Sequence, residues 1–175
     1  MSEFEIRLAR EDEFVDVGAL TVAGYDADGY LIRPDGSFDE GYATFLRDAQ
    51  TRGRDGALIV AADGDLLLGT STWCPPGSPF REVATVDSQG EFRSLSVSPD
   101  ARGKGVGRAL VNWCIDQAHH DGLAEIVLSS LPQMKPAHNL YESLGFIRRP
   151  DLDWSPMPDV HLWGFSLALA SRLTV

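Results

Sequence analysis

The chain has 175 residues, of which 43% are apolar, and its formal net charge at pH 7 is −11. That length and composition are enough for one soluble domain with a full hydrophobic core. Because an acidic protein repels nucleic acid and anionic membrane surfaces, we expect neither as a binding partner.

Cysteine usage and the N-terminal segment bear on the compartment. Cys74 and Cys114 form no metal-spaced motif, so we expect no metal site and a reducing environment. The first ten residues, MSEFEIRLAR, hold no apolar run of signal-peptide length. No stretch approaches the roughly 18 apolar residues of a membrane span. We therefore predict a cytoplasmic protein.

The first half of the chain alternates between strand and helix patterns. Strands are predicted where apolar and polar residues alternate, and helices where apolar residues recur at spacings of three and four. In order, the pattern predicts a strand at 4–8, a helix from residue 10, a loop at 25–30, a helix at 39–51, strands at 57–62 and 66–73, and a loop at 74–89 with room for a short strand at 83–86.

The second half continues the alternation. In order, it predicts a strand at 91–97, a glycine-rich turn, a helix from Gly105, a strand at 125–130, a helix at 135–144, a strand at 146–149, a loop at 151–159 and a strand at 160–169. No repeat, low-complexity tract or linker interrupts the chain. We therefore predict one domain over residues 1–175.

The turn after the strand at 91–97 is rich in glycine and basic residues, which makes it a candidate anion site. Glycine lets the backbone approach a ligand, and the N–H groups of a first helical turn have no partner within the helix. A P-loop is excluded because Gly103-Lys104 is followed by Gly105. A dinucleotide-binding fingerprint is excluded because neither glycine begins a G-x-G-x-x-G pattern. The residues expected at the anion are Arg102, Gly103, Lys104, Gly105, Val106, Gly107 and Arg108.

Two segments resemble one known family. Arg102-x-x-Gly105-x-Gly107 is similar to the pyrophosphate loop of the GNAT superfamily of N-acetyltransferases, whose pattern is Gln or Arg, two residues, Gly, one residue, and Gly or Ala. The segment AHNLYESLGF at 137–146 resembles that family's A-x-x-L-Y-E-x-L-G-F segment. The resemblance is clear over 91–146, and before that it rests on the order of elements.

The resemblance implies a fold and a cofactor. The fold would be the α/β (α+β) acyl-CoA N-acyltransferase fold, with a mixed, mostly antiparallel central sheet of about seven strands and about four helices on both faces. The cofactor would be acetyl-CoA, with its pyrophosphate on the turn at 102–107 and its phosphates near Arg102, Lys104 and Arg108. In the family the strand before the turn splays from its neighbour, so the pantetheine arm would bind the backbone of Leu95, Ser96 and Val97.

The resemblance also implies a reaction, which is direct transfer of acetyl from acetyl-CoA to a primary amine in a ternary complex. Tyr141 matches the motif tyrosine and would protonate the departing thiolate, since a pKa near ~10 suits a donor at neutral pH. Glu91 is our candidate for the base that deprotonates the amine, through a water chain; alternatively, it merely pairs with Arg93 or solvent. Met134 stands where many relatives have an asparagine that contacts the cofactor. A non-catalytic acyl-CoA-binding or sensing module is the alternative function.

The acceptor is expected to be a small-molecule or peptide amine. The family builds its acceptor pocket from two loops that, in this chain, supply Tyr25, Asp26, Asp28, Tyr30, Asp153 and Trp154. These aromatic and acidic residues would suit a cationic amine with an apolar body. We expect His138 to face solvent, and the alternating last strand could pair across a homodimer.

Overall fold

The computed structural model describes residues 3–170 of the chain. The chain divides into two compact units. The first unit consists of the described part of Met1–Trp73 together with Ser94–Trp113. The second consists of Cys74–Arg93 together with the described part of Cys114–Val175. The prediction of one domain over 1–175 remains a prediction.

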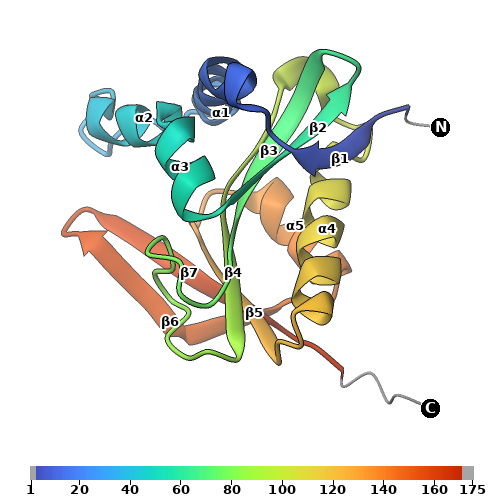
Figure 1. Ribbon diagram of the computed structural model, residues 1–175. Coiled ribbons are helices and arrows are strands. Elements are labelled where there is room, and N and C mark those ends of the chain that lie inside the picture. The colour runs from blue at the N-terminus through green and yellow to red at the C-terminus, as the bar shows by residue number, and fades with distance from the viewer. Residues whose placement is uncertain (1–2, 171–175) are drawn as a thin grey trace. The chain divides into compact units, whose positions relative to one another are not determined.

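Three antiparallel strands form the sheet of the first unit (Figure 1). They are β1 (Glu5–Leu8), β2 (Ala57–Asp63) and β3 (Leu66–Cys74). β2 and β3 are joined by the predicted hairpin turn, where Gly64 has a φ of +58°. Such a left-handed conformation is easily adopted only by glycine, which explains why the turn forms at this position.

Helices cover both faces of this sheet. Val17 of α1 (Phe14–Ala27) and Ala49 of α3 (Ala49–Asp55) pack on a core cluster with Leu58, Val60 and Ala62 of β2. On the opposite face, a Cβ added at Gly69 would lie 2.8 Å from Val106 Cγ1. Side chains alternate between the faces of a strand, so this sheet is buried on both sides.

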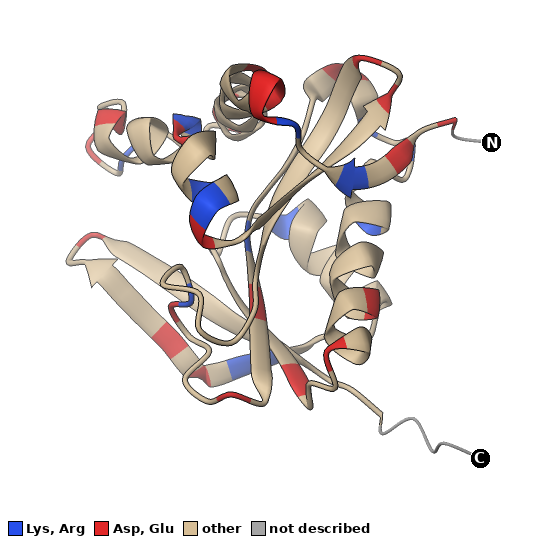
Figure 2. Cartoon of the chain, in the orientation of Figure 1, with Lys and Arg blue, Asp and Glu red and all other residues tan. Residues whose placement is uncertain are grey.

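The ion pairs at the start of the first unit include one nearly buried carboxylate. Glu13 accepts hydrogen bonds from Arg7 Nη1 at 2.9 Å, Arg7 Nη2 at 2.7 Å and the Arg10 backbone N–H at 2.8 Å. The hydrogen bonds from Arg7 lower the pKa of Glu13 to about 2 despite its burial. Figure 2 shows the charged residues along the ribbon; the whole chain has 26 acidic and 15 basic residues.

The second unit is built on three strands and one helix. Its elements are β5 (Glu125–Ser130), α5 (Lys135–Ser143), β6 (Ile147–Met157) and β7 (Val160–Ala168). β7 pairs antiparallel with both β5 and β6. β4 (Gln89–Val97) and α4 (Val106–His120) are divided between the units, and β4 pairs parallel with β5 at its start.

The strand order confirms the predicted fold class. The seven strands follow the order β1-β2-β3-β4-β5-β7-β6. Four of the pairings described above are antiparallel and one is parallel, so the sheet is mixed. Five α-helices accompany it in the described chain, one more than predicted.

Two helix predictions were wrong at their boundaries. The helix predicted over 39–51 is two helices, α2 (Glu40–Arg47) and α3, because Asp48 ends the first and caps the second by accepting from Thr51 N–H at 3.0 Å. α1 continues to Ala27, so Tyr25 and Asp26 lie in a helix, where we expected a loop. The possible short strand at 83–86 is also absent from the described second unit.

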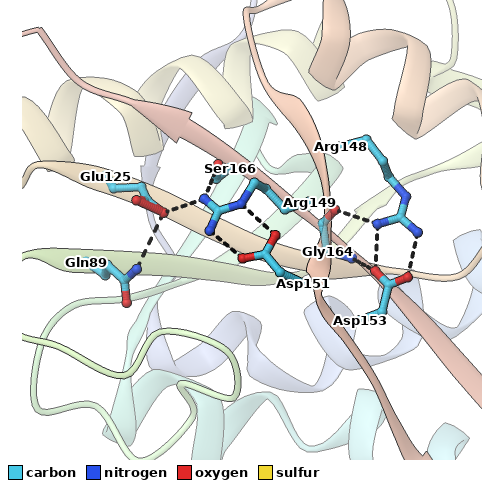
Figure 3. Close-up of polar contacts among 8 residues, drawn as sticks. All are labelled: Gln89, Glu125, Arg148, Arg149, Asp151, Asp153, Gly164 and Ser166. Carbon is cyan, nitrogen blue, oxygen red and sulfur yellow. Dashed lines mark hydrogen bonds and ion pairs between the residues drawn. The ribbon is translucent and has the colours of Figure 1, made fainter.

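The loop predicted at 151–159 was wrong, because β6 runs from Ile147 to Met157. Its register against β7 shifts between Arg149 and Trp154, so the intervening residues bulge out of the ladder. β6 is the last strand in the sheet order, and an edge strand with a bulge tolerates proline. Two ion pairs hold the bulge, Arg149 with Asp151 and Arg148 with Asp153 (Figure 3).

No helix in the described range 3–170 is long and apolar enough to cross a membrane.

Candidate active site

The glycine-rich turn lies in the first unit and is exposed. Gly103 and Gly105 have φ angles of +75° and +80°, and a Cβ added at either would meet no atom within 4 Å. The first intrahelical hydrogen bond beyond the turn is from Ala109 N–H to Gly105 C=O, at 3.0 Å. The N–H groups of Val106 and Gly107 precede that bond, so they are donors of the kind that bind anions at a helix N-terminus.

Arg102 is held by the end of α1. Its Nη1 donates to Asp28 Oδ1 at 2.6 Å, and its Nη2 donates to the Gly24 carbonyl oxygen at 3.1 Å. The guanidinium thus sits beside the carboxyl end of a helix, where positive charge is favoured. Of the three basic residues predicted around the turn, Arg102 therefore has a structural partner within the first unit.

The end of β4 packs closely on α1. Ser96 is buried, and its Oγ donates to the Thr21 carbonyl oxygen at 3.1 Å. A Cβ added at Gly24 would clash with that Oγ, so glycine is needed in α1 at this point. The Ser96 side chain therefore serves helix packing, which leaves only its backbone for the predicted cofactor contact.

Ser94 was missed as a special position, because no sequence signal marks it. It is a buried residue of β4 with a φ of +56°, the only non-glycine residue in the described chain with a positive φ. Left-handed residues within a strand locally redirect its backbone and are frequent near functional sites.

In the second unit, β4 and β5 part early. Their parallel ladder consists of Gln89 with Glu125, Gly90 with Ile126, and Glu91 with Val127. Within the described second unit no pair follows, although β5 continues to Ser130. Unpaired backbone at this place would leave the edge of a strand available to a ligand.

Glu91 is fully buried and its carboxylate binds backbone N–H groups. Its Oε1 accepts from the N–H groups of Glu82 at 3.0 Å, Val83 at 2.9 Å and Ala84 at 2.9 Å. Among residues 3–170, its Oε2 accepts only from Glu82 N–H, at 3.1 Å. Burial raises the pKa of Glu91 to about 7, and the N–H groups of Ala84 and Val83 act in the opposite direction. Glu91 therefore anchors the loop at 82–84, and a catalytic role remains a prediction.

Arg93 supports the same loop, and the ion pair described for it is with Glu82 rather than with Glu91. Its guanidinium forms an ion pair with Glu82, and its Nη1 donates to the Phe80 carbonyl oxygen at 3.1 Å. Val83 and Ala84 in turn pack against Val127 of β5. The loop before β4 is thus fixed to the second unit by both charged side chains and apolar contacts.

Tyr141 lies on α5 in an aromatic cluster. Its ring centroid is 5.8 Å from that of Phe92, 5.7 Å from that of Phe146 and 5.9 Å from that of Phe165. The side chain is almost fully buried, and among the described residues no hydrogen bond reaches its hydroxyl. Burial raises the pKa of Tyr141 above its ordinary value of 10, so the phenol keeps its proton at neutral pH.

The prediction that His138 faces solvent was wrong. The side chain is 5% exposed, and its Nε2 lies 3.0 Å from Ser130 Oγ at the end of β5. That hydroxyl also lies 3.5 Å from the sulfur of Met134. His138 stands three residues before Tyr141 and so shares its helix face, a spacing that could have indicated burial.

The residues predicted to line an acceptor pocket fall into both units, and two of the carboxylates are paired. Tyr25 is buried, with ring centroids 6.2 Å from Tyr30 and 6.0 Å from Tyr42. Asp28 pairs with Arg102, as described above. Asp153 pairs with Arg148 at 2.6 Å, and Trp154 Nε1 donates to Ser129 Oγ at 3.0 Å.

The comparison with protein families decides the assignment. The sequence model of the Acetyltransferase (GNAT) family matches residues 25–146, which is more than half of the chain. The chain belongs to this family. The match contains both the turn at 102–107 and Tyr141, although the roles of individual GNAT residues in this chain remain predictions.

A curated relative agrees with the GNAT assignment. The chain is 35% identical over 113 residues to a mycothiol acetyltransferase of Geodermatophilus obscurus, across 62% of this chain and 35% of that protein. Overall it spans about a third of the length of the curated relatives it matches.

Two solved structures share the fold. A GNAT-family acetyltransferase of Staphylococcus aureus Mu50 has a TM-score of 0.71 at 13% identity, covering 95% of this chain and 99% of that one. A Salmonella typhimurium protein solved with its cofactor acetyl-CoA has a TM-score of 0.65 at 19% identity, covering 98% and 97%. At these identities the likeness shows the fold alone.

Proposed function

We propose that this GNAT protein transfers an acetyl group from acetyl-CoA to a primary amine. The observation that carries the proposal is the exposed turn at 102–107. Its two left-handed glycines leave open space beside the N–H groups of Val106 and Gly107. Lys104 is exposed in the same turn and adds positive charge. Backbone donors, open space and a cation fit a diphosphate.

The far end of β4 supplies a second part of the cofactor site. Ser98 N–H donates to the Leu68 carbonyl oxygen of β3, at 2.8 Å. Because backbone groups alternate between the two edges of a strand, those of Leu95 and Val97 point to the edge away from β3. An amide-rich pantetheine arm could bind there like an added strand. The alternation of backbone groups along β4 therefore favours Leu95 and Val97 over Ser96 as the residues whose backbone binds the pantetheine arm.

Tyr141 would act as the general acid. Its buried phenol holds a proton at neutral pH, and its hydroxyl has no hydrogen bond within the described chain, so the proton is available to a departing thiolate.

The state of the two cysteines favours direct attack of the amine on the thioester over a covalent enzyme intermediate. Burial raises the pKa of Cys74 to about 12 and that of Cys114 further, so neither is a thiolate at neutral pH.

Glu91 would accept the proton of the attacking amine through water. Its pKa of about 7 leaves a substantial ionised fraction at neutral pH, which suits a general base. Only Oε2 has spare acceptor capacity, because Oε1 is surrounded by three N–H groups. The acceptor would be a small-molecule or peptide amine, and assembly as a homodimer remains a prediction.

Titration with acetyl-CoA, followed by thiol release with a panel of amines, tests this function. We expect acetyl-CoA to bind, and CoA thiol to appear only when a suitable primary amine is present. Binding without thiol release for any amine would favour an acyl-CoA sensing module. Failure of acetyl-CoA to bind at millimolar concentration would contradict the proposal.

A further inference from the structure

His138 is a buried polar residue that the proposed reaction does not use. Its imidazole stacks on Trp163 of β7 at a centroid distance of 5.6 Å and an interplanar angle of 24°, and packs on Phe165 at 4.9 Å. It also bonds to Ser130 of β5, as described above. One side chain of α5 therefore contacts both neighbouring strands of the second unit.

The ring of His138 has a polar partner on β5 as well as aromatic neighbours on β7. Its Nε2 lies 3.0 Å from Ser130 Oγ, within hydrogen-bond distance. Burial lowers the pKa of His138, which favours the neutral imidazole. The bond to Ser130 and the stacking on Trp163 together hold the ring in one orientation.

These contacts bear on Tyr141 through the helix that carries both residues. α5 has nine residues, too few to be stable alone, so its position depends on tertiary contacts. Tyr141 lies one turn after His138 on the same face, and both rings pack on Phe165. No hydrogen bond in the described chain fixes the Tyr141 hydroxyl, so the helix itself must aim it.

We propose that His138 is a positioning residue for acetyl transfer, whose bond to Ser130 and contacts with Trp163 and Phe165 set α5 so that the Tyr141 hydroxyl meets the leaving sulfur. This inference rests on the proposed function of Tyr141. His138 itself would touch neither acetyl-CoA nor the amine. Its loss should therefore lower kcat through Tyr141 while leaving cofactor binding intact.

A double-mutant cycle tests the inference on the intact chain. His138→Phe keeps a flat ring beside Trp163 and removes the hydrogen bond to Ser130. We expect it to lower kcat about tenfold, a size typical of coupled neighbours, with KM for acetyl-CoA within about twofold. In a Tyr141→Phe background the same change should cost nothing further. Asn139→Ala, at an exposed position of α5, is the matched control and should leave kcat unchanged.

The outcomes separate the two claims. If Tyr141→Phe lowers kcat and His138→Phe lowers it by the same factor in both backgrounds, only the role of His138 is overturned. If Tyr141→Phe leaves kcat unchanged, the acid role of Tyr141 fails and the inference fails with it. Should His138→Phe not fold, Ser130→Ala removes the same hydrogen bond and leaves the imidazole in place. We then expect about a threefold loss of kcat when Tyr141 is present and no further loss in the Tyr141→Phe background. An equal loss in both backgrounds would again overturn it.

Discussion

The turn at 102–107 differs in construction from three buried residues of the second unit, Glu91, His138 and Tyr141. The turn is exposed apart from the Val106 side chain, and its proposed binding groups are backbone N–H donors placed by left-handed glycines. The three residues of the second unit are buried at separate places, and desolvation shifts the pKa of each side chain. Recognition of a cofactor can use the main chain, whereas proton transfer needs titratable side chains away from bulk water.

This contrast predicts different consequences of substitution. Changes in the turn should weaken binding and leave the chemical step intact. Changes at the three buried residues should affect turnover or the pH dependence of folding and leave binding intact.

Tyr141→Phe should have the largest effect. It removes the only proton that we assign to the leaving thiolate, so kcat should fall about 10²–10³-fold while the Kd of acetyl-CoA stays within about twofold. Steady-state kinetics and calorimetric titration measure the two quantities. An unchanged kcat, or a loss of acetyl-CoA affinity without a loss of kcat, would show that Tyr141 does not act in the chemical step.

Glu91→Gln should change the pH dependence of stability. The pKa of Glu91 is raised from 4.5 to about 7 in the folded protein, so the folded state binds this proton more tightly. The resulting stabilisation is complete below pH 4.5 and is lost as pH rises through about 7, by about 3 kcal/mol in total. The difference in urea unfolding free energy between wild type and variant should therefore fall across this window. A difference in unfolding free energy that does not change with pH would contradict the raised pKa of Glu91.

Glu13→Gln, in the first unit, should show the opposite slope. Arg7 lowers the pKa of Glu13 from 4.5 to about 2, so this stabilisation is present above pH 4.5 and disappears as pH falls toward 2. We expect wild type to exceed the variant by about 2 kcal/mol at neutral pH, by roughly half of that at pH 3, and by only a small remainder at pH 2. The same urea series measures these differences in unfolding free energy, and an advantage that is undiminished at pH 2 would refute the assignment.

Gly105→Ala should have the smallest effect, and only on binding and stability. A side chain at a φ of +80° strains the backbone by about 1 kcal/mol and intrudes on the proposed diphosphate, so the Kd of acetyl-CoA should rise about tenfold. Gly64→Ala is a matched control, because Gly64 is also left-handed, with no atom near an added Cβ. It should lose similar stability and no affinity. Equal losses of affinity would mean that the turn is not the binding site.

Sequence patterns located those elements whose local signals agreed with their packing. β5 has the bounds predicted, since its apolar run is bounded by polar residues and buried. β6 was cut short because Pro156 and Pro158 indicate a loop, and nothing local shows that residues 151–157 belong to an edge strand with shifted register. The helix at 39–51 was not divided because the cap formed by Asp48 competes with an otherwise continuous helical pattern.

The candidate site was predictable where glycine spacing carries the information. Gly103 and Gly105 are left-handed, as a tight turn requires. The burial of His138 was missed because histidine is a polar residue type, and this was given more weight than its position on the same helix face as Tyr141. The loop anchored by Glu91 and the left-handed Ser94 depend on contacts made by the folded chain, which no local pattern encodes.

The proposed function depends on backbone N–H groups of the turn binding the diphosphate of acetyl-CoA. This contact is tested by the amide chemical shifts of a nitrogen-15-labelled sample, titrated first with pantetheine and then with CoA. We predict that the amides of 103–107 shift with CoA, which carries the diphosphate, and stay in place with pantetheine, which lacks it. If CoA binds and those amides do not move, the account is contradicted.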